Sequence, residues 1–264
     1  MDATVGMGGH SFEALGRMAG KGLLIGIDRD DNALKAAQDK LGSEHVALRK
    51  ARFSQLGEVL DGLDVKTING ALFDLGVSMP QLKVLERGFS YLSEGPLDMR
   101  MDPQADLTAE DVVNTYSEKE LERILREYGE ERFSKRIARM IVERRPIKTA
   151  KELAALVSGV YRKRGKIHPA TRTFQALRIE VNSELAELEA GLLAASGRLA
   201  VGGRLVVISY HSLEDRIVKH FFRKAQAEGM AKILTKKPLT AGMPEVRENP
   251  AARSAKLRAL ERAA

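Results

Sequence analysis

The chain has 264 residues, of which 44% are hydrophobic and 30% are charged, and its formal net charge is +7. It contains no cysteine, which excludes a disulfide framework, thiol catalysis and thiolate-ligated metal sites. The longest apolar runs, such as residues 205–209, are too short to span a bilayer, and no secretory signal opens the chain. These features predict a cytoplasmic protein that does not bind a membrane.

Positive charge is concentrated in two blocks. Residues 132–168 contain twelve lysines and arginines against two acids, a net charge of +10. Residues 216–264 contain twelve against four, a net charge of +8. Such blocks indicate a polyanionic partner, of which nucleic acid is the simplest. A pair of solvated helix faces explains the same charge equally well, so charge alone does not decide.

The first 75 residues alternate between strand and helix patterns. Residues 23–28 and 68–74 are short apolar runs that end in an acid, and residues 46–53 form a weaker strand pattern. A helical pattern at residues 32–41 separates the first two strands. This alternation is typical of βαβ units and predicts an α/β, doubly wound sheet.

The α/β pattern is interrupted in the middle of the chain. Residues 82–104 read as a loop with glycines and prolines, and residues 108–161 read as helix throughout. Thr108 with Asp111, and Ser117 with Glu120, have the spacing of helix-capping boxes. We therefore expect a helical insertion at residues 105–168 between two parts of one α/β domain, residues 1–104 and 169–264.

The α/β pattern resumes after the insertion. We expect the following elements there: a helix over residues 172–195, a strand over 204–210, a helix over 213–227 capped by Ser212 and Asp215, and a short last helix near 253–262.

A glycine-rich turn at residues 2–10 precedes a helix that we expect to start near Ser11. Glycines allow a backbone to approach a ligand closely, and a helix N-terminus offers unpaired N–H groups. Asp28 follows Gly8 by twenty residues and ends the next strand, where a carboxylate can bind the ribose of a nucleotide. Either NAD or S-adenosylmethionine fits this pattern, and so does a tight turn with a solvated acid. Asp74 ends a further strand, either as a ligand-binding carboxylate or as a turn cap.

Nine short segments, in order along the chain, closely resemble the bacterial RsmH (MraW) family. Members of that family use S-adenosylmethionine to methylate cytosine N4 in small-subunit ribosomal RNA. The segments are 8–11 (GGHS), 26–30 (GIDRD), 74–78 (DLGVS), 86–90 (ERGFS), 95–102 (GPLDMRMD), 128–133 (YGEERF), 168–176 (HPATRTFQA), 209–216 (SYHSLEDR) and 249–258 (NPAARSAKLR).

The resemblance implies a Rossmann-like class I methyltransferase sheet with an inserted all-helical domain that helps hold RNA. It also implies S-adenosyl-L-methionine as cofactor and a cytidine in the decoding (P-site) region of 16S ribosomal RNA as substrate, within the small subunit. The positions that match family cofactor-site residues are Gly8, Gly9 and His10 at the methionine part, Asp28 at the ribose, Phe53 at the adenine, and Asp74 and Gln81 near the reacting methyl group.

Two departures from the family pattern affect the prediction. Family members usually carry a longer segment before Asp2, with a helix and most of the first strand, so we expect the first strand of the sheet to be truncated. Met79 stands where the family normally has serine. A truncated, non-catalytic RNA-binding relative is therefore the alternative to a methyltransferase.

A cytosine amine is a poor nucleophile, and a carboxylate that accepts a hydrogen bond from it would stabilise the developing charge. We expect Asp74 or its neighbours to do this, with Ser78 and Gln81 shaping the pocket. Phe89 and Tyr91 could stack on an extruded base, although a core position for Phe89 is the simpler interpretation.

Other roles stay open at the level of sequence. Arg87 and Arg100 either contact phosphate or pair with the acids Asp98 and Asp102. His211, at a helix start, is expected to be structural. The five histidines lack metal-ligand spacing, so no metal is predicted. No DNA partner is expected and a homodimer is possible, whereas an NAD-dependent oxidoreductase is disfavoured because no substrate acid/base pair follows.

Overall fold

The computed structural model describes residues 1–42, 44–76, 87–161 and 167–264. Its contacts divide the chain into two compact units, the first made of Met1–Gly76 with Leu185–Ala264 and the second of Val77–Glu184. The expected insertion, residues 105–168, lies inside the second unit, whose bounds are wider at both ends. No helix in the described part of the chain is both long and apolar enough to cross a membrane.

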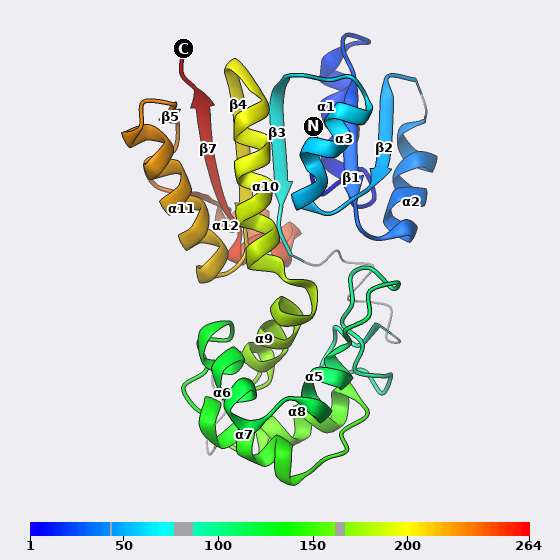
Figure 1. The fold of residues 1–264 in the computed structure, drawn as a ribbon, viewed down its shortest axis with the longest axis vertical. Helices are drawn as coiled ribbons and strands as arrows, with labels where there is room; N and C mark the ends of the chain where they lie inside the picture. The colour runs from blue at the N-terminus through cyan, green and yellow to red at the C-terminus, as the bar shows by residue number, and fades with distance from the viewer. Residues whose placement is uncertain (43, 77–86, 162–166) are drawn as a thin grey trace. The chain divides into compact units, whose positions relative to one another are not determined.

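The first unit is a mixed α/β sheet with helices on its faces (Figure 1). Its amino-terminal part contains α1 (Gly9–Met18), β1 (Leu24–Asp28), α2 (Asp31–Leu41), β2 (Val46–Lys50), the 3₁₀ turn η1 (Phe53–Gln55), α3 (Leu56–Gly62) and β3 (Ile68–Asp74). Its carboxyl-terminal part contains α10 (Glu184–Arg198), β4 (Leu199–Ser209), α11 (Ser212–Ala227), β5 (Ala231–Ile233), β6 (Leu239–Thr240), α12 (Met243–Glu248), the 3₁₀ helix η3 (Pro250–Ser254) and β7 (Lys256–Arg262).

Strands β1 and β2 pair in parallel, as do β3 and β4. The amino-terminal residues join these two pairs, because Asp2 forms parallel bridges to both Gly26 of β1 and Leu72 of β3. The backbone N–H of Asp2 donates to the carbonyl of Ile25 at 2.7 Å, and that of Ala3 donates to the carbonyl of Leu72 at 2.8 Å. The short segment expected to be a truncated strand thus lies between β1 and β3 and pairs with both.

The two faces of the sheet are covered by different helices because side chains alternate along a strand. Ile25 and Ile27 of β1 belong to a core shared with α3, α10 and α11. Leu24 of the same strand belongs to a smaller core with residues of α1 and α2. Helices on both faces, with parallel strands between them, confirm the expected doubly wound α/β fold.

The end of the chain differs from the sequence-based expectation. The helix predicted near residues 253–262 is wrong: Lys256–Arg262 is strand β7, which pairs antiparallel with β4, β5 and β6. Residues 256–262 contain good helix formers, but the ladder with β4 on one side and β5 on the other outweighs that preference. Three segments after Gly229, namely β5, β6 and β7, are therefore part of the sheet.

Two further elements also differ from the prediction. The single helix expected over residues 172–195 is two helices, α9 (Thr171–Asn182) and α10, because Ser183 adopts a left-handed conformation with φ of 51°. The second expected strand, residues 46–53, ends at Lys50, so Phe53 belongs to η1 and not to a strand.

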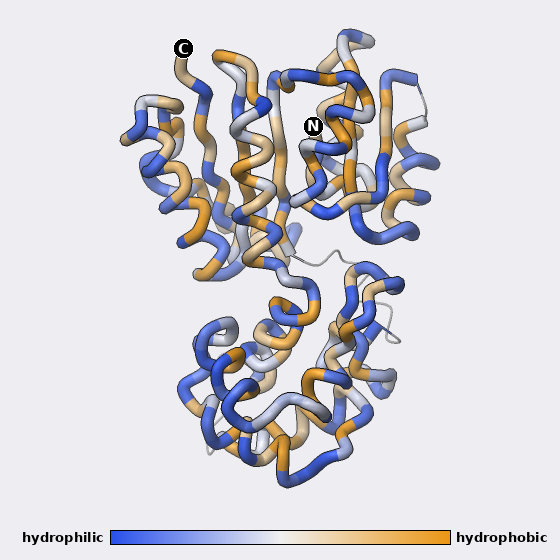
Figure 2. The backbone as a smooth tube through the Cα atoms, viewed as in Figure 1, coloured by the Kyte–Doolittle hydropathy of each residue, from blue (hydrophilic) through white to orange (hydrophobic). Residues whose placement is uncertain are grey.

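The second unit is built from helices, as its periodicity predicts. The helices within its described residues are α5 (Ala109–Thr115), α6 (Glu118–Glu127), α7 (Ser134–Glu143), α8 (Ala150–Ser158) and α9. Thr108 and Ser117 form the expected capping boxes with Asp111 and Glu120. Hydrophobic and hydrophilic residues alternate along α6 and α7 in Figure 2, and the apolar faces pack into one core around Leu121, Ile124 and Ile137.

Candidate cofactor site at the carboxyl edge of the sheet

The turn formed by residues 2–11 is held by its own side chains. Buried Asp2 accepts a hydrogen bond from the Thr4 N–H at 3.0 Å and another from the Ser11 hydroxyl at 2.6 Å. Gly8, with φ of 74°, is the N-cap of α1, and a Cβ there would lie 3.2 Å from the Leu41 side chain. The positive φ therefore favours glycine at this position, and a larger residue would also press against Leu41.

Asp28 ends β1 and faces this turn. Its Oδ2 accepts a hydrogen bond from the Gly6 N–H at 3.0 Å, and its Oδ1 accepts one from the Asp30 N–H at 3.0 Å. Burial raises the pKa of the Asp28 carboxyl, although both backbone hydrogen bonds act in the opposite direction. Each oxygen retains acceptor capacity, which is the requirement for binding two ribose hydroxyls.

Asp74 ends β3 on the other side of the same turn. Its N–H donates to the Thr4 hydroxyl at 2.7 Å, and its Oδ2 lies 3.3 Å from Nε2 of His10 in α1. Its Oδ1 accepts a hydrogen bond from the Tyr210 hydroxyl at 2.8 Å. The hydrogen bond to Asp74 raises the pKa of His10, while burial lowers it. Two chain segments that are distant in sequence, the amino-terminal segment with His10 and the end of β4 with Tyr210, therefore both contact the Asp74 carboxylate.

Phe53 follows β2 at the same edge of the sheet. Its ring contacts Phe73 edge-on, with centroids 5.3 Å apart, and the Arg29 guanidinium lies 5.7 Å from its centroid. Helix α10 approaches closely because residue 191 is glycine, where a Cβ would come within 2.6 Å of the Phe53 Cβ. The Phe53 ring is therefore held between Phe73 and Arg29, the residue that follows Asp28.

The structure thus brings together most of the residues singled out in the sequence. Gly8, Gly9 and His10 begin α1, and Asp28 and Asp74 flank the turn before it. Ser78, Gln81 and Met79 lie outside the described residues. Sequence reasoning missed Thr4 and Tyr210 as site residues. The only signal for Tyr210 was its position directly after β4, at the edge where ligand-binding side chains gather.

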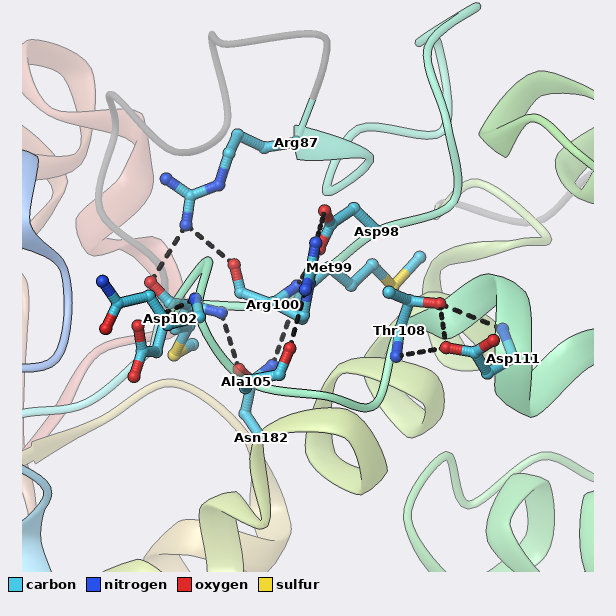
Figure 3. A network of polar contacts seen from close by, with 11 residues as sticks. Arg87, Asp98, Met99, Arg100, Asp102, Ala105, Thr108, Asp111 and Asn182 are labelled. Carbon is cyan, nitrogen blue, oxygen red and sulfur yellow. Dashed lines mark hydrogen bonds and ion pairs between the residues drawn. The ribbon is translucent and has the colours of Figure 1, made fainter.

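In the second unit, the loop before α5 is held by a network of polar contacts, shown in Figure 3. The Arg100 guanidinium forms two hydrogen bonds with Asp98, both 2.8 Å long. Arg87 donates to the carbonyls of Arg100 and Met101, at 2.7 and 3.0 Å. Arg100 therefore pairs with Asp98, which is one of the two alternatives left open, whereas these contacts of Arg87 are to backbone carbonyls, which neither alternative named.

Aromatic and histidine side chains also have defined places. Phe89 is buried in the core of the second unit, so its expected core position is confirmed. Tyr91 stacks on His168, with ring centroids 4.1 Å apart. His211, and not Ser212, is the N-cap of α11, because its Nδ1 accepts from the Glu214 N–H. Its expected structural role is confirmed.

The sheet is mostly parallel and carries glycines, carboxylates and an aromatic ring at its carboxyl edge. These features define a Rossmann-like α/β protein with a nucleotide-type site. Comparison with known proteins identifies the family within this class. The MraW methylase family matches residues 1–263, so this chain belongs to that family. The expectation of a methyltransferase is confirmed by this match, and the expected Rossmann-like sheet is confirmed by the strand pairing described above.

Two curated relatives are similar over nearly the whole chain. "Ribosomal RNA small subunit methyltransferase H" of Persephonella marina is 52% identical, over 99% of this chain and 92% of the relative. The protein of the same name in a Sulfurihydrogenibium species is 52% identical, over 98% of this chain and 90% of the relative. Among solved structures, a putative rRNA-methylase from Clostridium thermocellum is 15% identical with a TM-score of 0.44, covering 99% of this chain and 86% of that one. The family assignment rests on the sequence matches.

Proposed function

We propose that this protein transfers a methyl group from S-adenosyl-L-methionine to the exocyclic N4 of a cytidine in the decoding (P-site) region of 16S ribosomal RNA. The observation that carries the proposal is that one short turn contacts both strand-ending acids. Gly6 donates to Asp28, and Thr4 and His10 contact Asp74. Both carboxylates therefore border a single amino-terminal turn at one edge of the sheet.

The residues present fit S-adenosylmethionine. Asp28 is a desolvated carboxylate that can accept hydrogen bonds from ribose hydroxyls. The first turn of α1, which begins at Gly9, has N–H groups without intrahelical acceptors, where an anionic carboxylate is stabilised. A Cβ at Gly9 would have no protein atom within 4 Å, so a ligand can approach the backbone there.

The cofactor supplies an electrophilic methyl group on a sulfonium, so the protein's main tasks are positioning and charge stabilisation. Asp74 accepts a hydrogen bond from the acceptor amine and so stabilises the positive charge that develops on its nitrogen. The side chains of Asp74 and His10 are 27% and 56% exposed, which leaves a route by which the released proton can reach solvent. Ser78 and Gln81 complete the pocket in this proposal.

RNA binding is assigned to the helical insertion. Helix α7 carries Lys135, Arg136 and Arg139 on its exposed side, while Ile137 and Ile141 face the core. Glu143 on the same face pairs with Arg139 at 3.0 Å, which leaves a net positive charge there, and a positively charged helix face suits the phosphate backbone. The names of the curated relatives support ribosomal RNA of the small subunit as the substrate class.

The test uses wild-type protein and the Asp28→Asn variant. Calorimetry with S-adenosylmethionine is expected to give binding to the wild type and an affinity at least about tenfold lower for the variant, because a hydrogen bond to a charged group contributes about 1.5–3 kcal/mol. Small subunits that lack the modification are then incubated with cofactor, and their RNA is digested to nucleosides for mass spectrometry. N4-methylcytidine supports the proposal. Absence of cofactor binding would favour the non-catalytic RNA-binding alternative, and methylation at another atom would refute the N4 assignment.

A further inference from the structure

Tyr210 is the one tyrosine of the first unit, and the catalytic assignment above gives it no role. We propose that Tyr210 is a positioning residue for methyl transfer, whose hydroxyl holds Oδ1 of Asp74 while His10 holds Oδ2. The carboxylate is then fixed from both sides in the orientation that the acceptor amine requires. The inference rests on the proposed function, because it takes Asp74 as the group that contacts the amine.

The backbone places Tyr210 beside Asp74 through the register of the sheet. Asp74 of β3 is opposite Ile208 of β4, and the Leu75 N–H donates to the Ile208 carbonyl at 2.9 Å. Tyr210 follows two residues later, at the carboxyl end of β4. Because β4 runs parallel to β3, the Tyr210 phenol lies at the same edge of the sheet as Asp74.

The backbone of Tyr210 is itself fixed by the start of α11. The Glu214 carboxylate is buried and accepts hydrogen bonds from the N–H groups of Tyr210, at 2.9 Å, and His211, at 3.2 Å. In the same capping box, His211 accepts a bond from the Glu214 N–H. The phenol is thus attached to a helix start with a defined geometry, and not to a free loop.

The hydroxyl of Tyr210 is a permanent donor in this environment. Burial raises the pKa of Tyr210 far above the ordinary 10, and the Asp74 charge raises it further. The phenol therefore keeps its proton throughout the physiological pH range. Its hydroxyl donates a hydrogen bond to Oδ1 of Asp74, 2.8 Å away. Gly76, whose φ of 104° favours glycine, lies beside the ring, and a Cβ built there would be in ordinary van der Waals contact with it at 3.5 Å.

Two donors limit the rotation of the Asp74 carboxylate without occupying all of its acceptor positions. The terminal torsion of an aspartate is broad, so a carboxylate with a single partner can rotate. With Tyr210 and His10 on separate oxygens, rotation would break at least one contact. A carboxylate has about four acceptor positions, so positions remain for the amine of the substrate. Misplacement of a reacting group costs rate, while the binding of cofactor and RNA is unaffected.

His10 reports on this arrangement independently of activity. The charged groups that act on its imidazole are Asp74 and the buried Asp2 of the amino-terminal turn. Asp2 is already engaged by Ser11 and Thr4. The pKa of His10 therefore depends mainly on Asp74, and on whether Asp74 also accepts a hydrogen bond from Tyr210.

The first experiment compares Tyr210→Phe with the wild type in steady-state methylation of unmodified small subunits. The variant keeps the ring and loses only the hydroxyl. We expect kcat to fall about tenfold, while KM for cofactor and for RNA changes less than about twofold. Tyr116→Phe is the matched control: it removes a tyrosine–carboxylate bond, 3.0 Å long, to Glu180 in the second unit. Its kcat should stay within about twofold of the wild type.

The second experiment follows the His10 imidazole by NMR, assigned with a His10→Asn variant. Without the hydrogen bond from Tyr210, the negative charge of Asp74 stabilises the protonated imidazole of His10 more strongly. The titration midpoint of His10 should therefore rise in Tyr210→Phe and fall in Asp74→Asn. If Asp74→Asn abolishes methylation but Tyr210→Phe changes neither kcat nor the His10 midpoint, positioning by Tyr210 is overturned and the proposed function stands. If wild-type protein methylates no RNA, the proposed function fails, whatever the titration shows.

Discussion

Replacing Gly26 with alanine tests how the amino-terminal segment is held in the sheet. A Cβ at position 26 would lie 2.7 Å from the Leu48 Cδ2 and 3.0–3.1 Å from the Val5 side chain. Leu48 is only partly buried and can change its rotamer, whereas β-branched Val5 is 3% exposed and stiff. Overpacking of this kind costs about 1–3 kcal/mol, so we expect the free energy of unfolding to fall by that amount.

The assay is urea denaturation of Gly26→Ala beside Gly16→Ala. Gly16 lies inside α1 and has no protein atom within 4 Å of a built Cβ, so alanine there should stabilise the helix by up to about 1 kcal/mol. Because the Val5 N–H donates to the Ile27 carbonyl at 3.0 Å, a displaced Val5 should also weaken cofactor binding in Gly26→Ala. A loss below about 0.5 kcal/mol, with unaltered cofactor affinity, would refute the close packing of Val5 against β1.

Three further changes test other parts of the structure. The pKa of His10 is raised by Asp74, so its contribution to stability is complete below 6.5 and is lost as pH rises through the raised pKa; melting temperatures across this range should vary less in His10→Asn than in the wild type. Asp215→Leu removes the 2.7 Å partner of the buried Arg258 guanidinium and should cost about 3–5 kcal/mol in denaturation, much of it recovered when Arg258 is also replaced by methionine. Lys135→Glu should weaken RNA binding and lower the salt dependence of the affinity by about one counterion, whereas unchanged binding would argue against RNA contact through α7.

Local patterns in the sequence were sufficient to predict much of the α/β fold. Strand β3 has the bounds that its apolar run predicts, and the helices of the second unit begin at Thr108 and Ser117, where the capping boxes place them. Apolar runs, capping pairs and glycine spacing involve neighbouring residues, so a sequence displays them directly. The same spacing identified Asp28 and Asp74 as acids at strand ends.

The tertiary structure decided what depends on residues far apart in the chain. Residues 256–262 became a strand because β4 and β5 lie on either side of them, and strand preference depends on such neighbours more than on the residues themselves. Tyr210 reaches Asp74 across 136 positions in sequence, through the pairing of β3 with β4. The sequence by itself predicted which carboxylates lie at the candidate site. Only the fold decided which side chains hold them in place, because hydrogen bonds between distant segments leave no periodic signal.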